Sequence, residues 1–426
     1  MLQFQKNKNY TMQIIKKLQT TIIKSQYFIL GFLIILLPYW GFFEKFQHLS
    51  VIFFFLILVS GLINIKNLLT NKIIISVSAF FLFSMLSILW SPAETVTWEY
   101  LRNLHNYKYY FVLLISIYSL SLSPQQIKNL FFIMALAPLG ISVIYYLNAF
   151  GVTHIYSALF FHGNSNLLSH YLINNFFILY SATYFYVLFF DSISKQDTKK
   201  TLLSLFATLF FAISLVIDPL SVARLMLVAF LAVLLIVPLF YLPKKKALLI
   251  VLVMLIFGSI FISTNKKMQQ GIKTVTTAIE NEKYTGSWGH RLGFAIVGLK
   301  IYNEHPIIGR GINDVRARTI EFAQNNPKYF IYDHNRHFHN EHINILVEVG
   351  LIGYILFAIF IYLFFTFSIK NEFLLKLKYT FIISFLVLML GEHYLHNQQV
   401  GSFFFIFLSL MLLYHKQEKL LRSHLV

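Results

Sequence analysis

The sequence predicts an all-α, polytopic membrane protein with about 12 transmembrane helices and one large hydrophilic loop. Of its 426 residues, 57% are hydrophobic and only 12% are charged, which is more apolar than a soluble globular domain. A helix that crosses a bilayer needs roughly 20 apolar residues. Twelve runs approach that length, near 27–43, 48–65, 73–90, 109–122, 128–149, 167–190, 202–218, 225–242, 247–264, 343–368, 379–391 and 401–414.

The distribution of charge argues against nucleic acid as a partner, although the net charge is +18. The basic residues are scattered through short connections between apolar runs, which is the pattern of membrane topology. The chain has no cysteine, which excludes disulfides, a thiolate nucleophile and a cysteine-ligated metal. The first apolar run follows a basic segment but lacks a small-residue cleavage site, so we expect it to be retained.

The basic residues of the short connections also predict the orientation in the membrane. With a cytoplasmic amino terminus, the inside segments hold twenty Lys and Arg and the short outside segments hold four. In a bacterium this predicts a multi-pass protein of the inner (cytoplasmic) membrane whose hydrophilic loop lies in the periplasm. The expected parts are a cytoplasmic basic amino terminus (1–26), transmembrane helices 1–9 (27–264), a large periplasmic loop (265–342), transmembrane helices 10–12 (343–414) and a cytoplasmic carboxy terminus (415–426).

The expected loop holds six of the fifteen histidines and eleven of the thirty-five Lys and Arg residues. Apolar residues recur at helical spacing over 292–302, and Pro306 ends that pattern. This predicts a helix that lies on the membrane or on the bundle. A second helix is predicted over 313–324, followed by a turn at 325–327.

The end of this loop carries the polar residues that look most functional. His339 and Asn340 stand directly before an apolar run that carries Glu341, Asn344 and Glu348 on one helical face. Such a stripe must face protein or water rather than lipid. Two interpretations are open: either Asn344 and Glu348 bond neighbouring helices and His339 only caps the helix, or this junction is the active site.

Two glycines, Gly350 and Gly353, follow in the same run. Small residues at this spacing allow helices to approach closely. We expect both to be positions of close helix packing.

Arginines near the expected outer face are candidates for binding a diphosphate. Arg224 follows a short loop with Ser221 and is the only basic residue there. An arginine at this depth often extends to lipid phosphates, but its planar guanidinium can also bind a diphosphate with two parallel hydrogen bonds. Arg291 begins the helix predicted in the loop and supplies a second such group. Weaker candidates, expected to be solvated or at lipid head groups, are Arg310, Arg316, Arg318 and Arg336.

Four histidines raise the question of zinc: His334, His337, His339 and His342. Their spacing matches no HExxH motif, and no external segment has a DxD pair of carboxylates for a divalent cation. We therefore expect metal-free chemistry, with no metal ligand and no cofactor.

The run HNEHINILVEVGLIG from His339 to Gly353, preceded by NEHPIIGRG at 303–311, resembles the carboxy-terminal motif of the O-antigen ligase and polymerase superfamily. The helix count, the late large loop and the stretch from Ser221 to Arg224 are also similar to that superfamily. One departure is Ile343 in place of the usual leucine, which conserves volume. The resemblance implies a fold like that of GT-C-type membrane glycosyltransferases.

The resemblance implies an O-antigen ligase of lipopolysaccharide biosynthesis, which transfers a glycan from undecaprenyl diphosphate to a hydroxyl of the lipid A core. Arg224 and Arg291 would bind the donor and stabilise charge on the leaving diphosphate. His339 would be the base for the acceptor hydroxyl, because neighbouring arginines keep its imidazole neutral. A single in-line displacement would invert the anomeric centre. The residues expected to contribute to substrate binding are Asn340, His337 and His342. Membrane lipids are further expected partners.

Three other functions are open. A polysaccharide polymerase uses the same chemistry but typically has two sizeable external loops, whereas this chain has one. A protein O-oligosaccharyltransferase of the superfamily usually carries an extra carboxy-terminal region. A twelve-helix secondary transporter, from a different class, is expected to show internal repeats and ionisable residues in the middle of its spans, and the sequence shows neither.

Overall fold

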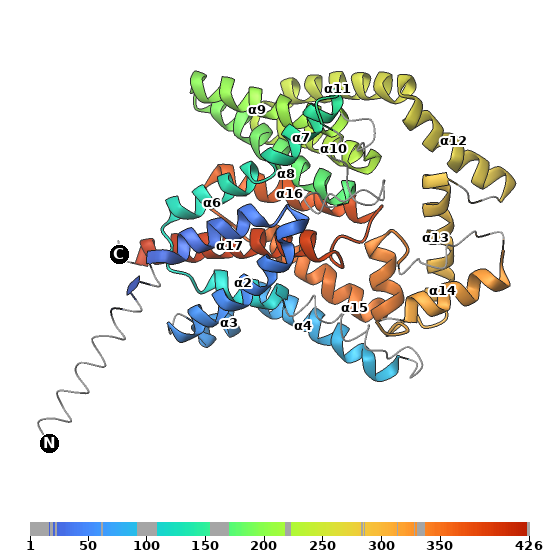
Figure 1. Cartoon of the computed structure of the whole chain (residues 1–426), viewed down its shortest axis with the longest axis horizontal. Coiled ribbons are helices and arrows are strands. Elements are labelled where there is room, and N and C mark those ends of the chain that lie inside the picture. The colour runs from blue at the N-terminus through green and yellow to red at the C-terminus, as the bar shows by residue number, and fades with distance from the viewer. Residues whose placement is uncertain are drawn as a thin grey trace, which may run out of the picture.

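The computed structural model describes residues 24–60, 63–91, 109–153, 170–217, 223–282, 286–312, 314–327 and 337–423, with a few single residues between these ranges. Within them the chain is helical and has no β-strand, which confirms the predicted all-α class. Figure 1 shows a bundle of long helices with a group of shorter helices at one end.

In the described part of the chain, eight helical segments are long and apolar enough to cross a membrane, which confirms the polytopic membrane class. They are α4 (Lys72–Leu86) with its 3₁₀ extension η1 (Ser87–Trp90), α6 (Pro124–Leu136) with α7 (Leu139–Ala149), α8 (Tyr171–Ser194), α9 (Thr198–Ile217), α10 (Arg224–Tyr241), α11 (Lys244–Thr264), α15 (Glu341–Thr366) and α17 (Gln398–Ser423). Shorter or more charged helices are Lys24–Leu36, α2 (Trp40–Val59), Tyr109–Tyr118 and α16 (Glu372–Met389). Each of the twelve predicted runs overlaps one of these segments.

Helices α17 and α8 form the centre of the bundle. In their most apolar windows 89% and 83% of the residues are buried, against 6% in α11, which lies at the outside. Aromatic rings fill the centre: Phe407 and Phe404 of α17 lie 4.0 and 4.6 Å, centroid to centroid, from Phe381 and Phe385 of α16. Because such rings interdigitate closely, they fix how α16 and α17 pack and so where the connection between them, residues 390–397, lies.

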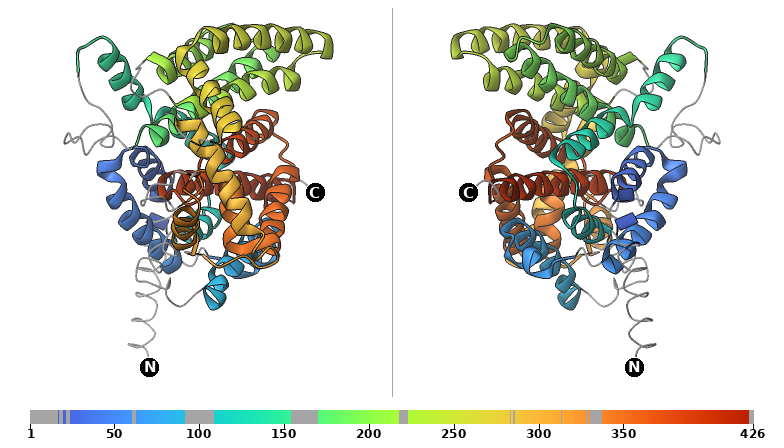
Figure 2. Two further views of the ribbon diagram at one scale, coloured as in Figure 1. Left: turned by 90° about the vertical axis from the view of Figure 1, so that its right-hand side faces the viewer. Right: turned by 90° about the vertical axis from the view of Figure 1, so that its left-hand side faces the viewer.

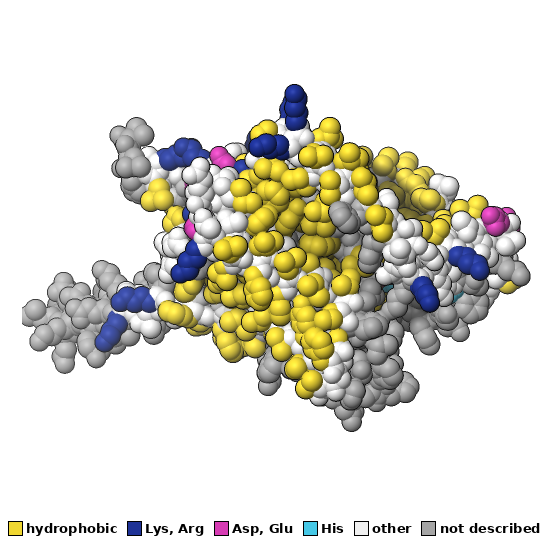
Figure 3. All heavy atoms as spheres, turned by 90° about the horizontal axis from the view of Figure 1, so that it is seen from above, with side chains coloured by type: hydrophobic (Ala, Val, Ile, Leu, Met, Phe, Trp, Pro, Cys, Tyr) yellow, Lys and Arg dark blue, Asp and Glu magenta, His cyan; other side chains and the backbone are white. Residues whose placement is uncertain are grey.

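The outer face of the bundle is hydrophobic. Figure 3, which looks down on the side where α9 and α11 lie, shows a broad apolar surface with Lys and Arg toward its margins. Among the exposed hydrophobic residues of these two helices are Leu203 and Phe206 of α9 and Leu248 and Leu249 of α11. A soluble protein seldom exposes so large an apolar area, so this surface is suited to contact with lipid.

Three helices of the loop cross the end of the bundle: α12 (Lys266–Asn281), α13 (Gly286–Tyr302) and α14 (Asp314–Asn325). Helices α13 and α14 confirm the two helices predicted over 292–302 and 313–324. The sequence interpretation missed α12, because its residues are too polar to register as an apolar run. Its amino terminus is capped by Asn265, whose side chain accepts a hydrogen bond from the Met268 N–H at 3.1 Å.

Helix α15 is kinked at Gly350, which has φ +63° and ψ −166°. Such an angle favours glycine. The kink frees the Val347 carbonyl, which accepts a hydrogen bond from the Arg310 N–H at 2.9 Å, and across it the Leu351 N–H donates to the Pro306 carbonyl at 2.9 Å. The prediction of helix packing at Gly350 is therefore wrong, because the close neighbour is the segment 306–311. Gly353 does face a helix, since a Cβ there would lie 3.4 Å from the Phe83 ring of α4.

Candidate active site

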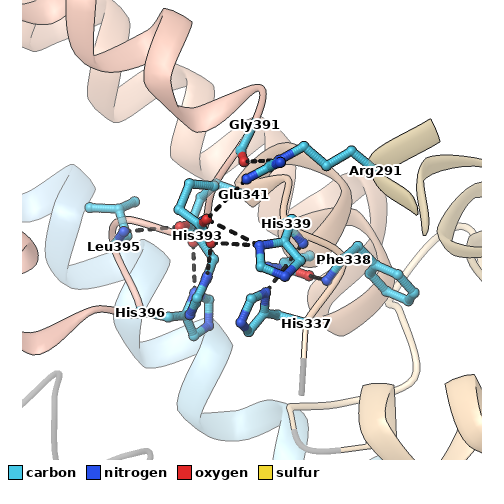
Figure 4. Close-up of polar contacts among 11 residues, drawn as sticks. Arg291, His337, Phe338, His339, Glu341, Gly391, His393, Leu395 and His396 are labelled. Carbon is cyan, nitrogen blue, oxygen red and sulfur yellow. Dashed lines mark hydrogen bonds and ion pairs between the residues drawn. The ribbon is translucent and has the colours of Figure 1, made fainter. Parts of the chain in front are cut away.

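The site lies where residues 337–340 meet the connection 390–397 between α16 and α17 (Figure 4). Asn340, not His339, caps α15: its Oδ1 accepts a hydrogen bond from the Ile343 N–H at 3.1 Å. Its Nδ2 donates to the Leu390 carbonyl at 3.1 Å, which ties the two segments together. The interpretation that His339 only caps the helix is therefore wrong. His339 instead has φ +50°, a left-handed conformation that turns the chain just before the cap.

His339 pairs with a carboxylate that the sequence interpretation did not include. Its Nδ1 lies 2.9 Å from Oε1 and 3.1 Å from Oε2 of Glu392. His393 Nδ1 lies 2.7 Å from the same Oε1. Burial alone would raise the pKa of Glu392, but the hydrogen bonds from the two histidines outweigh it and hold that pKa well below its usual range. The carboxylate is therefore ionised at neutral pH, and its preferred hydrogen bond is with a protonated Nδ1 of His339.

The pairing leaves the other ring nitrogen of His339 available. None of the hydrogen bonds in the described part of the chain uses His339 Nε2, and the side chain is 29% exposed. An imidazole that donates from Nδ1 has its lone pair on Nε2. This arrangement is that of a general base whose tautomer is set by a buried carboxylate.

Both predicted arginines lie beside this pair. The Arg291 Nε donates to the Gly391 carbonyl at 3.0 Å, and its Nη2 lies 3.7 Å from Glu392 Oε2. The guanidinium of Arg224, the first residue of α10, lies 5.9 Å from the ring centroid of Trp288 on α13. The two guanidinium groups are near enough for their charges to interact. The structure therefore brings together Arg224 of α10, Arg291 of α13 and His339, which lies just before α15.

His337 and His342 differ in their placement. The ring of His337 lies against that of His393, and its Nδ1 accepts a hydrogen bond from the His339 N–H at 3.2 Å. Burial lowers the pKa of His337 well below its usual range, and protonation of the neighbouring His393 or His339 would lower it further, so this imidazole is neutral. His342 points elsewhere: its Nδ1 lies 3.2 Å from the Tyr354 hydroxyl, further along α15.

The polar stripe of α15 faces protein. Glu341 Oε2 accepts a hydrogen bond from the Leu395 N–H at 2.9 Å, and Asn344 Oδ1 accepts one from the Phe338 N–H at 2.9 Å. His396 bridges two carboxylates, with Nδ1 at 2.6 Å from Glu341 and Nε2 at 3.2 Å from Glu348. Burial would lower the pKa of His396, but the two carboxylates outweigh it and raise that pKa well above its usual range. The stripe thus bonds loops on the same side as the site rather than neighbouring helices.

Two of the weaker arginine candidates, Arg310 and Arg318, form ion pairs outside the site. Arg310 and Arg318 both pair with Glu304, at 2.7 and 2.6 Å, instead of being solvated singly. Outside the described residues or side chains lie Ser221, Arg316, His334 and Arg336.

A group of side chains at the site could hold a metal ion. The donor atoms of His337, His339, Glu392 and His393 all lie within 4.8 Å of one another. Three of these residues are histidines and one is a carboxylate, a donor set that suits zinc. In the structure, however, the donors bond one another or a backbone N–H, so that an ion would have to replace those hydrogen bonds. The absence of a metal stays a prediction.

The sequence interpretation missed Glu392, His393 and His396. One signal could have found them: the polar run GEHYLHNQQ at 391–399 lies between two apolar runs, on the same side as the loop in the predicted topology. It also missed His170, which precedes α8. Burial lowers the pKa of His170 to about 4, and Glu392 and His339 are close enough to act on it.

Comparison with known proteins agrees with the motifs. The family model described as O-antigen ligase matches residues 209–358, from α9 to the middle of α15. The resemblance to the O-antigen ligase family is thereby confirmed. Proteins of this family are membrane enzymes of the ligase and polymerase type that act on lipid-linked glycans. The matched segment contains Arg224, Arg291 and His339 but ends before Glu392. A search of curated proteins found no match.

Proposed function

We propose that the chain acts as an O-antigen ligase, a membrane glycosyltransferase that moves a glycan from undecaprenyl diphosphate to a hydroxyl of the lipid A core. The observation that carries the proposal is the pair of His339 and Glu392 beside Arg291 and Arg224. A base with a defined tautomer and two guanidinium groups are what a transfer from a diphosphate to a hydroxyl requires.

The proposed reaction is one displacement. The acceptor hydroxyl loses its proton to His339 Nε2 as its oxygen forms a bond to the anomeric carbon of the donor. The bond between that carbon and the diphosphate oxygen breaks, and its electron pair leaves with the diphosphate. Since attack and departure occur on opposite sides of the carbon, the anomeric centre inverts.

The residues of the site have different proposed roles in this displacement. Glu392, ionised and buried, holds the proton on His339 Nδ1 and stabilises the imidazolium that forms when Nε2 takes a proton. Arg224 and Arg291 bind the donor diphosphate and stabilise the charge that grows on it. Arg291 is itself held by the Gly391 carbonyl, so its position is set before the donor arrives. Substrate binding by Asn340, His337 and His342 stays a prediction. Asn340 ties its loop to Leu390, whereas His342 lies beside the Tyr354 hydroxyl and would act at a distance from the pair.

We propose that this chemistry needs no metal. The imidazole and carboxylate that could act as ligands are already bonded to one another in the geometry of a base and its orienting group. The two guanidinium groups supply the positive charge that a divalent cation would otherwise bring to a diphosphate.

The proposed location is the bacterial inner membrane, with residues 265–342 in the periplasm and both termini in the cytoplasm. The short-connection charge count supports it. A cysteine placed at the exposed Gln269 of α12 should react with a membrane-impermeant maleimide once the outer membrane is permeabilised. Labelling that requires lysis of the inner membrane would reverse the topology.

A polysaccharide polymerase is the second candidate, because it would use the same residues with a growing glycan as acceptor. The single large loop favours the ligase.

Deletion of the gene, followed by a gel of the lipopolysaccharide, separates the functions. Loss of long chains with carrier-linked polymer accumulating is the result expected of a ligase. Loss of the polymer itself would contradict the proposal in favour of a polymerase, and unchanged lipopolysaccharide with altered glycoprotein would point to a protein O-oligosaccharyltransferase. If lipopolysaccharide and glycoprotein are both unchanged and only solute uptake is altered, the transporter is favoured.

A further inference from the structure

A second charged site lies at the end of the bundle away from His339. Helix α17 begins next to the site at Gln398, and its residues from Leu412 to Leu420 are about 20 to 33 Å further along its axis at 1.5 Å per residue. There they line a cavity of about 730 Å³, together with the start of α4, the short helix α3 (Ile65–Thr70) and the end of α15.

The cavity wall contains both basic and apolar residues. Three lysines and a histidine line it: Lys72, Lys416, Lys419 and His415. No Asp or Glu is among the lining residues that the structure describes. The apolar part of the wall consists of Ile73, Leu363, Phe367, Leu412 and Leu420. A ligand suited to this cavity therefore has both a negatively charged group and hydrocarbon.

The acidic groups described near the cavity do not neutralise the positive charge of its lysines. Glu418, the acidic residue beside the lysines on α17, accepts hydrogen bonds from the Lys370 and Asn371 N–H groups at 3.0 and 3.2 Å and so is turned to the start of α16. No lysine of the cavity forms an ion pair with a carboxylate in the described part of the chain. Lys416 is held at the wall by the Tyr118 carbonyl, 3.2 Å from its Nζ.

The amino terminus of α4 is not what would attract the anion. The side chain of Asn71 already accepts hydrogen bonds from the Ile73 and Ile74 N–H groups, at 3.0 and 3.3 Å. The attraction comes from the lysine side chains. Each lysine near an anionic lipid surface raises the affinity by about one order of magnitude or less.

The size and surroundings favour a lipid over a free anion. A volume of about 730 Å³ is many times the roughly 30 Å³ share of one water molecule, so a phosphate ion would fill little of it. Helix α3, which borders the cavity, also exposes Ile65 and Leu69, 66% and 69% accessible, as a helix in the head-group region would. Basic pockets between helices on the cytoplasmic side are typical sites for anionic lipid head groups.

We propose that this cavity binds the phosphate head group and upper acyl chain of an anionic phospholipid, with Lys72, Lys416 and Lys419 on the phosphate. The lipid comes from the leaflet on the side away from His339, which is the cytoplasmic leaflet in the proposed topology. It would brace the ends of α4, α15 and α17, the helices on which the site residues at their other ends depend.

The test uses the purified full chain in a neutral detergent, with phosphatidylglycerol, phosphatidylcholine and inorganic phosphate as separate probes. Bound lipid is measured by native mass spectrometry, and the unfolding temperature by a thermal scan. We expect phosphatidylglycerol to be retained and to raise the unfolding temperature more than phosphatidylcholine does. Replacing Lys72, Lys416 and Lys419 with Gln should weaken phosphatidylglycerol binding about 100-fold.

A matched control replaces three exposed lysines on the same predicted side, Lys199, Lys200 and Lys244, with Gln and should keep the binding. The double variant Lys72→Gln/Lys419→Gln leaves the Lys416 hydrogen bond to Tyr118 intact, so the test holds even if the triple variant fails to fold. Binding that is unchanged in the double variant, or lost equally in the control, would overturn the site. Equal stabilisation by inorganic phosphate would overturn its assignment to a lipid.

Discussion

Two histidine and carboxylate clusters lie where residues 339–348 meet the connection 390–397, and they are built in opposite ways. In one, a single carboxylate, Glu392, accepts from two imidazoles, His339 and His393. In the other, a single imidazole, His396, bridges two carboxylates, Glu341 and Glu348. The first cluster leaves Nε2 of His339 without a hydrogen bond among the described residues, whereas in the second both ring nitrogens of His396 are bonded.

This difference gives the two clusters different expected roles: the first takes part in the reaction, and the second stabilises the fold. A base needs a nitrogen lone pair that a substrate can reach, and only the first cluster offers one. His396 instead joins the amino-terminal part of α15 to the connection that carries Glu392, and Glu341 in this bridge is fully buried. We therefore expect changes in the first cluster to reduce turnover of a folded protein and changes in the second to reduce stability.

The largest expected effect is that of His339 on the rate. Replacing His339 with Asn or Ala should lower transfer by about 10² to 10⁴ while donor affinity changes little, because help from a general base appears mainly in the transition state. Asparagine tolerates the left-handed φ of +50° at this position, so His339→Asn should fold. Transfer, donor affinity and expression are measured together. A well-folded, active His339→Asn would show that the imidazole is not the base.

The arginines should come next, with a different pattern. Arg224→Ala or Arg291→Ala is expected to weaken donor binding as well as turnover, by about 10² to 10³ overall, because the diphosphate is charged before the reaction as well as during it. Lysine should restore little, since an ammonium cannot form two parallel hydrogen bonds. Donor affinity and rate of Arg224→Lys and Arg291→Lys decide this. If both lysine variants were fully active, the two arginines would contact lipid head groups rather than bind the diphosphate.

His396 should affect stability more than rate. His396→Asn leaves Glu341 and Glu348 facing each other without a cation and should cost on the order of 3 kcal/mol. Because the pKa of His396 is raised, its stabilisation is fully present below about pH 6.5 and is lost as the pH rises through the raised pKa. Unfolding temperatures of the two proteins should therefore converge at alkaline pH. A gap between them that is constant with pH would mean that the imidazolium is not what stabilises the bridge.

The smallest expected effect is that of chelation. Purified protein should keep its transfer activity in EDTA, because the donors of the first cluster are bonded to one another. Added zinc should inhibit, since an ion bound by His337, Glu392 and His393 would also draw His339 out of its hydrogen bond. Loss of activity in EDTA that one divalent cation restores would make this cluster a metal centre instead.

The sequence was sufficient for the apolar helices and for three residues that the structure brings to the candidate site. Apolar runs locate helices because lipid-exposed and core helices both need them, and Arg224, Arg291 and His339 stand at run boundaries, where a polar residue is unusual. It was not sufficient for Glu392, because that residue meets His339 from 53 residues away. Their contact depends on how the aromatic rings of α16 and α17 pack.

The glycines and the helix cap of α15 also show what the sequence could not predict, here among residues close together in the chain. Gly350 and Gly353 have a spacing typical of helix packing, yet Gly350 opens a kink that only the segment 306–311 explains. His339 and Asn340 both precede the helix, and only the backbone angles show that Asn340 is the cap. Helix α12 was missed because a polar helix has no apolar run to reveal it.

The central claim is that Glu392 acts on the reaction through His339, and a double-mutant cycle tests it most directly. Transfer rates are measured at saturating donor, so that any effect on donor binding through Arg291 is removed, for His339→Asn, Glu392→Gln and the double variant. The account predicts that Glu392→Gln lowers the rate about 10-fold or more in the wild-type background and not at all in the His339→Asn background. The same factor in both backgrounds would contradict it, because Glu392 would then act independently of the imidazole.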